Sequence, residues 1–330
     1  MKHYLLIGAG FSYNWGGWLS IEAFEFLLGD PAVVKNRELR ELLWKHQPRG
    51  GFEAALDELQ RQPGSHSKEN EAQLRAAIAR MFAAMNLAFT SGGLEFARGP
   101  LNEQPVRDFL VRFDAIFSLN QDLLLENRYR GTAEGLIDRA NPKTQRSWQL
   151  PGMKLLEDPA VTLRYPLETG LWVPSGKHDL ASDEQPIVKL HGSSNWRTAE
   201  GSEVMILGGG KAEAIARFPI LRWYADLFVQ CIARSGTKLM IIGYGFRDDN
   251  INIALERGLD RGLRVFIVDP KGAFAADSLN EVPKEGIGYA PTTIQQKLVD
   301  ALVGASRRPF ASTLSTDSVE RQKLDRFFEG

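Results

Sequence analysis

The amino-acid sequence predicts an α/β fold with a Rossmann-like, mostly parallel sheet and helices on both faces. Three observations lead to this class. Continuous runs of Ile, Leu and Val recur along the chain, and such runs are typical of strands that helices cover on both faces. Stretches with apolar residues at helical spacing separate these runs. Several runs end in Gly, Asn, His or Asp, and open α/β sheets bind ligands at the carboxyl ends of their strands.

The elements follow from these patterns in order. The predicted strands are YLLIGAG (4–10), AIFSLNQD (115–122), PIVKLHGS (186–193), KLMIIGYGF (238–246) and RVFIVDP (264–270). The predicted helices are 37–46, 52–62, 71–89, 218–236, 292–305 and 318–330. Gly236 is expected at the residue that follows a helix end, because glycine readily adopts the left-handed conformation found there.

Domain organisation follows from where the alternation of strands and helices stops. Residues from about 20 to 106 are predicted to be a helical insertion, whereas 131–184 are rich in Pro, Gly and Trp and lack periodicity. We interpret both segments as insertions into a single domain that spans 1–330. Residues 292–330 are expected to form a helical C-terminal tail.

Composition narrows the classes of function. The formal net charge is −1, so no basic excess predicts direct binding to nucleic acid or to an anionic membrane. No stretch approaches the roughly 20 apolar residues of a membrane span, and we interpret the first residues as a strand, not as a signal peptide. The single cysteine, Cys231, excludes an internal disulfide and any zinc site built on paired cysteines. These observations favour a cytoplasmic protein without a metal centre.

A glycine-rich turn follows the first predicted strand. Glycines here permit a tight turn and close approach of the backbone to a diphosphate, although Tyr13 stands where a full dinucleotide motif has its third glycine. A purely structural turn is the alternative. The residues in question are Gly8, Ala9, Gly10, Phe11 and Ser12. A second glycine stretch, LGGGKAE (207–213), does not match a P-loop. It is interpreted as a flexible loop, with contact between Lys211 and a phosphate as the alternative.

Polar residues interrupt the second strand at SLNQD (118–122). Asn is a poor strand residue, because its side chain bonds to nearby backbone. Two interpretations are open for Asn120 and Asp122: the side chains face a ligand, or one of them caps the following helix.

Three further strand ends carry candidate site residues. His191 and Gly192 follow an apolar run, and Gly243 and Tyr244 follow another. Asp248 and Asp249 come next, either as site residues or as a helix cap. Asp269 ends the last strand, where it binds the hydroxyls of a ribose or simply forms an Asp-Pro turn.

Taken together, these strand ends resemble a sirtuin-like domain, and more narrowly the sirtuin-like NAD hydrolases of bacterial antiphage defence systems. The matching stretches occur in the expected order: GAGFS, FSLNQD, KLHGSSNW, IIGYGFRDDNIN and FIVDP. GFEAALDEL and the C-terminal tail are also similar to the bacterial branch. The chain departs from protein-deacylating sirtuins in three places. It lacks the four zinc-binding cysteines, its first loop continues as YNWGGWLS, and GYGFRDD replaces the Gly-Thr-Ser loop. These departures argue against an acyl-lysine substrate.

The resemblance implies an NAD+ hydrolase that releases nicotinamide and ADP-ribose without a metal. Asn120 then holds a ribose hydroxyl or the attacking water, since its amide both donates and accepts hydrogen bonds. His191 acts as the general base. NAD+ contacts are expected at Gly8, Ala9, Gly10, Phe11, Ser12, Asp122, Gly192, Gly243, Tyr244 and Asp269. A sensor that binds NAD or ADP-ribose without turnover, and a scaffold subunit, remain as alternatives.

The resemblance also implies a role and partners. The expected role is the toxic effector of a prokaryotic antiphage system, which acts by depleting NAD+. We expect a homo-oligomer that is activated in trans by a protein partner, such as a HerA-type ATPase or a short Argonaute. Candidate surface residues for assembly, with core packing as the alternative, are Trp44, Phe82, Phe327 and Phe328.

Overall fold

A parallel sheet forms the centre of the molecule. The computed structural model describes residues 1–49, 51–62, 64–89, 106–129, 147–156, 170–280 and 293–329. The seven strands lie in the order β11-β10-β9-β1-β2-β6-β3, and every pairing between them is parallel. They are β1 (Lys2–Ile7), β2 (Ala115–Ser118), β3 (Trp148–Gln149), β6 (Gln185–Lys189), β9 (Thr237–Ile242), β10 (Arg264–Val268) and β11 (Leu302–Ser306).

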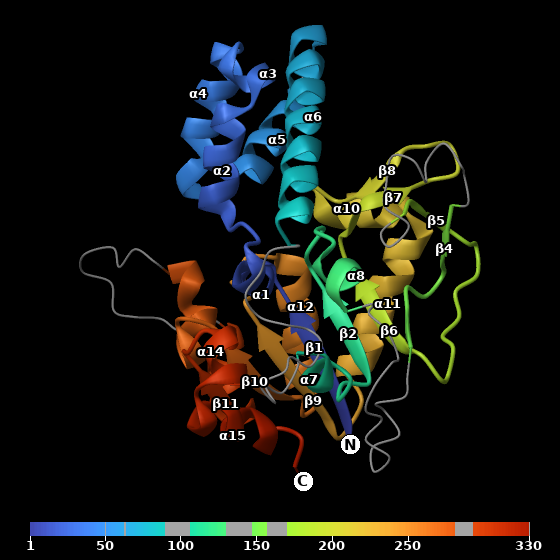
Figure 1. Cartoon of the computed structure of the whole chain (residues 1–330), viewed down its shortest axis with the longest axis vertical. Helices are drawn as coiled ribbons and strands as arrows, with labels where there is room; N and C mark the ends of the chain where they lie inside the picture. The colour runs from blue at the N-terminus through green and yellow to red at the C-terminus, as the bar shows by residue number, and fades with distance from the viewer. Residues whose placement is uncertain are drawn as a thin grey trace.

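The inner strands are buried on both faces, as their continuous apolar sequences predict, whereas the edge strands β3 and β11 are only partly buried. All four residues of β2 are buried, and so is all of β1 and β10 except the first residue of each. Helices provide the cover: α11 (Pro219–Ile232) lies against β6 and β9, and α13 (Thr293–Ala301) lies against β10. The predicted α/β, Rossmann-like class is therefore confirmed (Figure 1).

A smaller sheet lies beside the main one. It contains β4 (Met153–Leu155), β5 (Trp172–Pro174), β7 (Gly192–Arg197) and β8 (Glu203–Met205), in the order β4-β5-β7-β8. The chain passes from β6 of the main sheet to β7 of the smaller sheet through only Leu190 and His191. The described part of 131–184 is thus less irregular than predicted, because it contains β3, β4 and β5. Strands of two or three residues are too short to leave a periodic signal in a sequence.

The helical insertion is α2 to α6. It comprises α2 (Ser20–Gly29), α3 (Pro31–Val34), α4 (Arg37–His46), α5 (Gly51–Arg61) and α6 (Ser65–Ala88). In Figure 1 it rises above the end of the sheet at which β1 finishes, which is the carboxyl edge. Asp30 caps α3 and also pairs with Arg80 of α6 at 2.7 Å, so it joins two helices of the insertion. The three helices predicted in this segment are confirmed. The prediction began α6 at 71 instead of Ser65, because the first turns of the helix are polar and carry no apolar periodicity.

The remaining helices lie between the strands or, for the last two, follow β11. They are α1 (Ala9–Ser12), α7 (Val106–Leu110), α8 (Leu124–Arg128), α10 (Lys211–Arg217), α12 (Asp249–Leu259), α14 (Phe310–Ser315) and α15 (Ser318–Arg326), with short 3-10 segments at Tyr13–Trp15, Gln47–Arg49 and Gly272–Asn280 (η5). The role predicted for Gly236 is wrong, because α11 ends at Ile232 and Gly236 instead turns the chain into β9 with a φ of 72°.

The C-terminal segment is not wholly helical. The helix predicted over 292–305 stops at Ala301, and the next residues form the edge strand β11. Gly304 makes this pairing possible, because a Cβ there would lie 2.5 Å from the ring of Phe266 on β10. The segment therefore completes the sheet before α14 and α15 begin.

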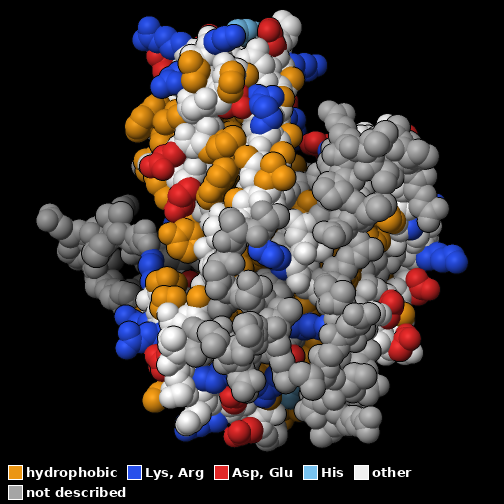
Figure 2. Space-filling model, viewed as in Figure 1, with side chains coloured by type: hydrophobic (Ala, Val, Ile, Leu, Met, Phe, Trp, Pro, Cys, Tyr) orange, Lys and Arg blue, Asp and Glu red, His pale blue; other side chains and the backbone are white. Residues whose placement is uncertain are grey.

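Of the four aromatic residues considered for assembly, three belong largely to the core. Phe82 and Phe327 are buried, and Phe328 packs against Phe109 and Phe113. Trp44 differs, since it is 59% exposed on the helical insertion. Figure 2 shows hydrophobic side chains interspersed with charged ones over the insertion, where the exposed large apolar residues are Ile21, Val34, Trp44 and Leu87. Within the described residues, no helix has the length and apolar character needed to cross a membrane.

Candidate functional site

Glycines bring two loops into contact at the carboxyl edge of the sheet. The backbone N–H of Gly10 donates to the carbonyl oxygen of Gly243 at 3.0 Å. A Cβ on Gly8 would lie 2.5 Å from the same oxygen, and Gly243 has a φ of 63°. The structural requirement for these glycines is thus the contact between the loops after β1 and β9. Ala9 is exposed, whereas the side chain of Phe11 is buried against Trp15 and Phe310, so it does not face a ligand.

Asn120 ties the loop after β2 to the glycine turn. Its side-chain amide donates to the carbonyl oxygen of Gly8 at 3.0 Å and to the hydroxyl of Ser12 at 2.9 Å. Ser12 in turn hydrogen-bonds the carboxylate of Asp122. Three predicted site residues, Ser12, Asn120 and Asp122, therefore form one buried hydrogen-bonded chain.

Asp122 serves the following helix as well as this chain. Its Oδ1 accepts a hydrogen bond from the backbone N–H of Leu124, the first residue of α8, at 3.0 Å. The N-cap position of α8 is Leu123, so Asp122 supports the helix from the residue before it, and it also bonds Ser12. The ligand contact expected of Asp122 stays a prediction. Burial raises the pKa of Asp122, although the ammonium of Lys189 opposes that rise.

A buried ion pair holds the loop between β2 and α8 in place. Lys189 Nζ lies 2.7 Å from the carboxylate of Glu126, and both side chains are only 2% exposed. Lys189 also donates to the carbonyl oxygen of Asp122. Sequence reasoning missed this pair, although a lysine inside the apolar run PIVKL was a signal that could have drawn attention to it.

His191 lies next to the Asn120 loop. Strand β2 pairs with β6 at Ser118 and Lys189, so Asn120 and His191 each lie two residues beyond a paired position, at the same edge. The backbone N–H of Ser194 donates to the carbonyl oxygen of Gln121, which joins the two loops. Sequence reasoning thus brought the two proposed catalytic residues to neighbouring strand ends.

Asp248 faces His191 across this edge. His191 Nε2 lies 3.3 Å from Asp248 Oδ2, but the contact lacks hydrogen-bond geometry, and neither atom has a hydrogen-bond partner among the described residues. Asp248 is also the N-cap of α12, because its Oδ1 accepts from the backbone N–H groups of Asn250 and Ile251. Burial by itself raises the pKa of Asp248, but His191 and Lys211 outweigh burial and hold that pKa well below its usual range.

Lys211 connects Asp248 to the helical insertion. Its ammonium lies 3.3 Å from Asp248 Oδ2 and 3.0 Å from Glu53 Oε2 on α5. Burial lowers the pKa of Lys211, but the two carboxylates raise it by more. The interpretation of 207–213 as an unconstrained loop is incomplete, since Lys211 begins α10 and is held by both acids.

Three other predicted residues have structural roles. The hydroxyl of Tyr244 accepts from the backbone N–H of Asp248 and donates to Asn252 at 2.8 Å, so it braces the start of α12. Gly192 has a φ of 73°, and a Cβ there would lie 2.0 Å from the carbonyl oxygen of Val204. Asp269 directly follows β10 and accepts from the backbone N–H of Lys271 at 2.8 Å, as in an Asp-Pro turn.

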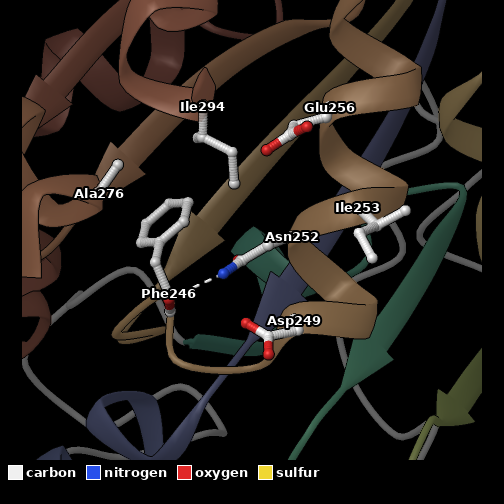
Figure 3. Close-up of a pocket in the computed structure, with 7 residues that line it drawn as sticks. All are labelled: Phe246, Asp249, Asn252, Ile253, Glu256, Ala276 and Ile294. Carbon is white, nitrogen blue, oxygen red and sulfur yellow. Dashed lines mark hydrogen bonds between the residues drawn. The ribbon is translucent and has the colours of Figure 1, made fainter. Parts of the chain in front are cut away.

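A cavity lies close to this edge but is lined by other residues. Its volume is ≈ 340 Å³, and it opens between α12, η5 and α13 (Figure 3). Its lining consists of Phe246, Asp249, Asn252, Ile253, Glu256, Ala276 and Ile294. Asp249, one of the two acids considered from the sequence, lines it, whereas none of the residues predicted to bind NAD+ or to act in catalysis does. In the described part of the chain, no cluster of three or more His, Cys, Asp or Glu side chains could hold a metal ion.

A parallel sheet whose polar and charged side chains gather at the carboxyl edge defines a ligand-binding α/β protein of the Rossmann-like class. A family model described as a SIR2-like domain matches residues 114–284, just over half of the chain. The chain therefore belongs to the SIR2-like family, whose enzymes use NAD+. The comparison with curated proteins returned no match.

The matched region contains most of the site but not the glycine turn. Asn120, His191 and Asp248 lie inside 114–284, whereas residues 8–12 precede it. The fold joins them because β1 lies between β2 and β9. The glycine turn is therefore part of the same carboxyl edge.

Proposed function

We propose that the chain is an NAD+ hydrolase that releases nicotinamide and ADP-ribose. The observation that carries this proposal is a pair of buried atoms, His191 Nε2 and Asp248 Oδ2, at the same strand edge as Asn120. The two atoms lie 3.3 Å apart, and neither makes a hydrogen bond to any residue that the structure describes. Buried polar groups usually find hydrogen-bond partners. Such atoms beside a preorganised amide suit a site that receives a hydroxyl or a water molecule from its substrate.

In the proposed reaction, water attacks the anomeric carbon of the ribose that carries nicotinamide. The bond from that carbon to the nicotinamide nitrogen breaks, and its electron pair neutralises the positive charge of the pyridinium ring. The water forms the new C–O bond and gives a proton to His191, which acts as general base. Asn120 orients the ribose hydroxyl or the water, and positioning of this kind lowers the barrier without any covalent step on the protein.

The residues fit NAD+ as a substrate in two respects. The amide of Asn120 is held in place by Gly8 and Ser12, so its orientation is fixed before a ligand arrives. The carboxylate of Asp122 is linked to Asn120 through the hydroxyl of Ser12. The resemblance to sirtuin-like domains assigns this carboxylate to the nicotinamide carboxamide. Binding of the diphosphate by the glycine turn and of the adenosine ribose by Asp269 belongs to the same proposal.

The proposed biological role is the effector of a prokaryotic antiphage defence system that acts by NAD+ depletion. It is supported by the five motifs that resemble the defence branch of sirtuin-like proteins. The role includes assembly into a homo-oligomer and activation by a protein partner, for which a HerA-type ATPase and a short Argonaute are the candidates. The alternative is a subunit that binds NAD+ or ADP-ribose without cleaving it.

Incubation with NAD+ tests the proposal. We expect nicotinamide and free ADP-ribose to appear in equal amounts. The isolated protein should release them slowly, and the protein mixed with the product of a neighbouring gene should release them more rapidly. Turnover is expected to persist in EDTA when the partner's own metal requirement is assayed separately. Retention of bound, intact NAD+ by the assembled protein would instead support the alternative.

A further inference from the structure

Four charged or titratable side chains form a continuous line from the helical insertion to His191. Glu53 belongs to α5, Lys211 begins α10, and Asp248 caps α12. The successive distances are 3.0 Å from Glu53 to Lys211, 3.3 Å from Lys211 to Asp248 and 3.3 Å from Asp248 to His191. Glu53 is more than a hundred positions from the other three in the sequence, yet it joins their line of contacts.

The orientation of Asp248 is fixed by its other contacts. Oδ1 is committed to the backbone N–H groups of Asn250 and Ile251, and the hydroxyl of Tyr244 holds the backbone N–H of Asp248 itself. Oδ2 is therefore left to face His191 and Lys211. A carboxylate fixed in this way acts on its neighbours as a stationary negative charge.

We infer that Asp248 is a positioning residue for His191 and that Glu53 and Lys211 set the charge which Asp248 presents to it. This inference rests on the proposed function for its catalytic meaning, but its electrostatic content stands independently of turnover. Glu53 attracts the Lys211 ammonium toward the insertion. Without Glu53 the ammonium would face Asp248 alone. Glu53 of the insertion therefore contributes to the charge that acts on the His191 ring.

The sign of each effect follows from Coulomb's law. The Asp248 carboxylate stabilises the protonated imidazole, whereas the Lys211 ammonium opposes protonation. Glu53 favours protonation, because it adds negative charge and draws Lys211 away from Asp248. Among the described residues, other charged groups near this edge are Asp122, Glu126 and Lys189, which lie around one buried ion pair. Asp249 follows Asp248, and Asp57 of α5 pairs with Arg61 beside the loop that leads to Lys211. All of these stay unchanged in the variants below.

Histidine ring signals measured by NMR across a pH titration test the inference directly. The chain has five histidines, and the His191 signal is assigned by its loss in His191→Gln. We expect Asp248→Asn to lower the pH midpoint of the His191 titration by about one unit or more, as for loss of an adjacent opposite charge. Glu53→Gln should lower it by less, and Lys211→Met should raise it. Asn is itself a good N-cap, so Asp248→Asn keeps the start of α12.

Glu58→Gln is the matched control. Glu58 lies on the same helix as Glu53 but contacts His46 at 2.6 Å and Lys45 at 2.6 Å. The Glu58→Gln substitution should change the His46 signal and leave the His191 signal unchanged. That result would show that a change in the His191 signal requires a substitution within the line of charges.

The outcomes separate the inference from the proposed function. Opposite shifts in Lys211→Met and Asp248→Asn support the inference, including in a preparation that leaves NAD+ intact. An unchanged His191 midpoint in the folded variants overturns it, even where NAD+ is cleaved normally. A ring that stays in one protonation state over the whole pH range in every variant also overturns it. Glu53→Gln and Lys211→Met alter partly exposed side chains, so they maintain the test if Asp248→Asn does not fold.

Discussion

The two sides of the candidate site differ in how their buried polar atoms are satisfied. The Asn120 side consists of Ser12, Asn120 and Asp122, whose side chains bond one another and nearby backbone. The His191 side consists of His191, Lys211 and Asp248, and two of its buried atoms make no hydrogen bond within the described chain. Ser12, Asn120 and Asp122 on one side and His191 and Asp248 on the other are all buried. Burial alone therefore does not explain why only one side has its hydrogen bonds made.

The difference separates a preorganised part of the site from a part that waits for a ligand. A buried polar group without a hydrogen bond costs about 1–3 kcal/mol. On the His191 side, charge partly offsets that cost, because the Asp248 carboxylate lies between an ammonium and an imidazole. We therefore expect Asn120→Ala to affect both stability and turnover, and His191→Ala to affect mainly turnover.

The largest expected effect comes from breaking the ion pair beneath the Asn120 side. Lys189→Met leaves the Glu126 carboxylate buried and unpaired, and loss of one partner of such a pair costs about 3–5 kcal/mol. Chemical denaturation should show this loss of stability. The double variant Lys189→Met, Glu126→Leu should recover much of it, because no charge is then left in the core. A single variant as stable as the unaltered chain would mean that the pair does not support this loop.

Asn120→Ala tests the preorganised side itself. It removes the donors to Gly8 and Ser12, so NAD+ cleavage should fall roughly a hundredfold or more, and unfolding free energy should fall by about 1–3 kcal/mol. Nicotinamide release and denaturation measure the two losses. The control is Asn127→Ala, whose side-chain amide donates a long hydrogen bond of 3.4 Å to the carbonyl oxygen of Asn86. Undiminished cleavage in folded Asn120→Ala would remove Asn120 from the mechanism.

The two buried acids should give opposite dependences of stability on pH. The pKa of Asp122 is raised by burial, so its contribution is present below the unfolded pKa of about 3.9 and is lost as pH rises through the folded value. The pKa of Asp248 is lowered by His191 and Lys211 despite burial, so its contribution is present above about pH 3.9 and is lost as pH falls.

These signs are measurable in two isosteric variants. At pH 7, Asp122→Asn should melt at a higher temperature than the unaltered chain and Asp248→Asn at a lower one. The Asp122→Asn difference should shrink as pH falls toward 4, whereas the Asp248→Asn difference should persist to about pH 4 and shrink only below it. Asn keeps the hydrogen bond to Leu124 in the first variant and the helix cap in the second. Shifts of the same sign in both variants would contradict the contrast between the two sides.

The smallest effect is expected at Asn86, which joins both sides to the insertion. It accepts a hydrogen bond from the backbone N–H of Leu123 at 2.9 Å and donates to the Ser194 hydroxyl at 3.2 Å. Asn86→Ala should reduce turnover a few-fold and stability by about 1 kcal/mol, as for the loss of ordinary hydrogen bonds. Steady-state kinetics and thermal unfolding measure both, and a change in neither would show that α6 does not position these loops.

The sequence predicted the strand ends better than their surroundings. Apolar runs and the polar residues that end them are local signals, so Asn120 and His191 could be placed at one edge without coordinates. The alternatives set for Asp248 were incomplete, because its two oxygens serve different partners: one caps α12 and one faces His191. Glu53, Lys211 and Glu126 could not be found in this way, because their partners are distant in the sequence. The strand β11 was missed because its residues continue a helical pattern.

Cleavage and binding of NAD+ by His191→Ala, compared with the unaltered chain, test the central claim most directly. In the assembled protein, we expect the variant to bind NAD+ with similar affinity but to release nicotinamide roughly a hundredfold or more slowly. His66→Ala, which changes an exposed histidine paired with Glu38, should cleave normally. Normal cleavage by folded His191→Ala, or no cleavage by the unaltered assembled protein, would contradict the account.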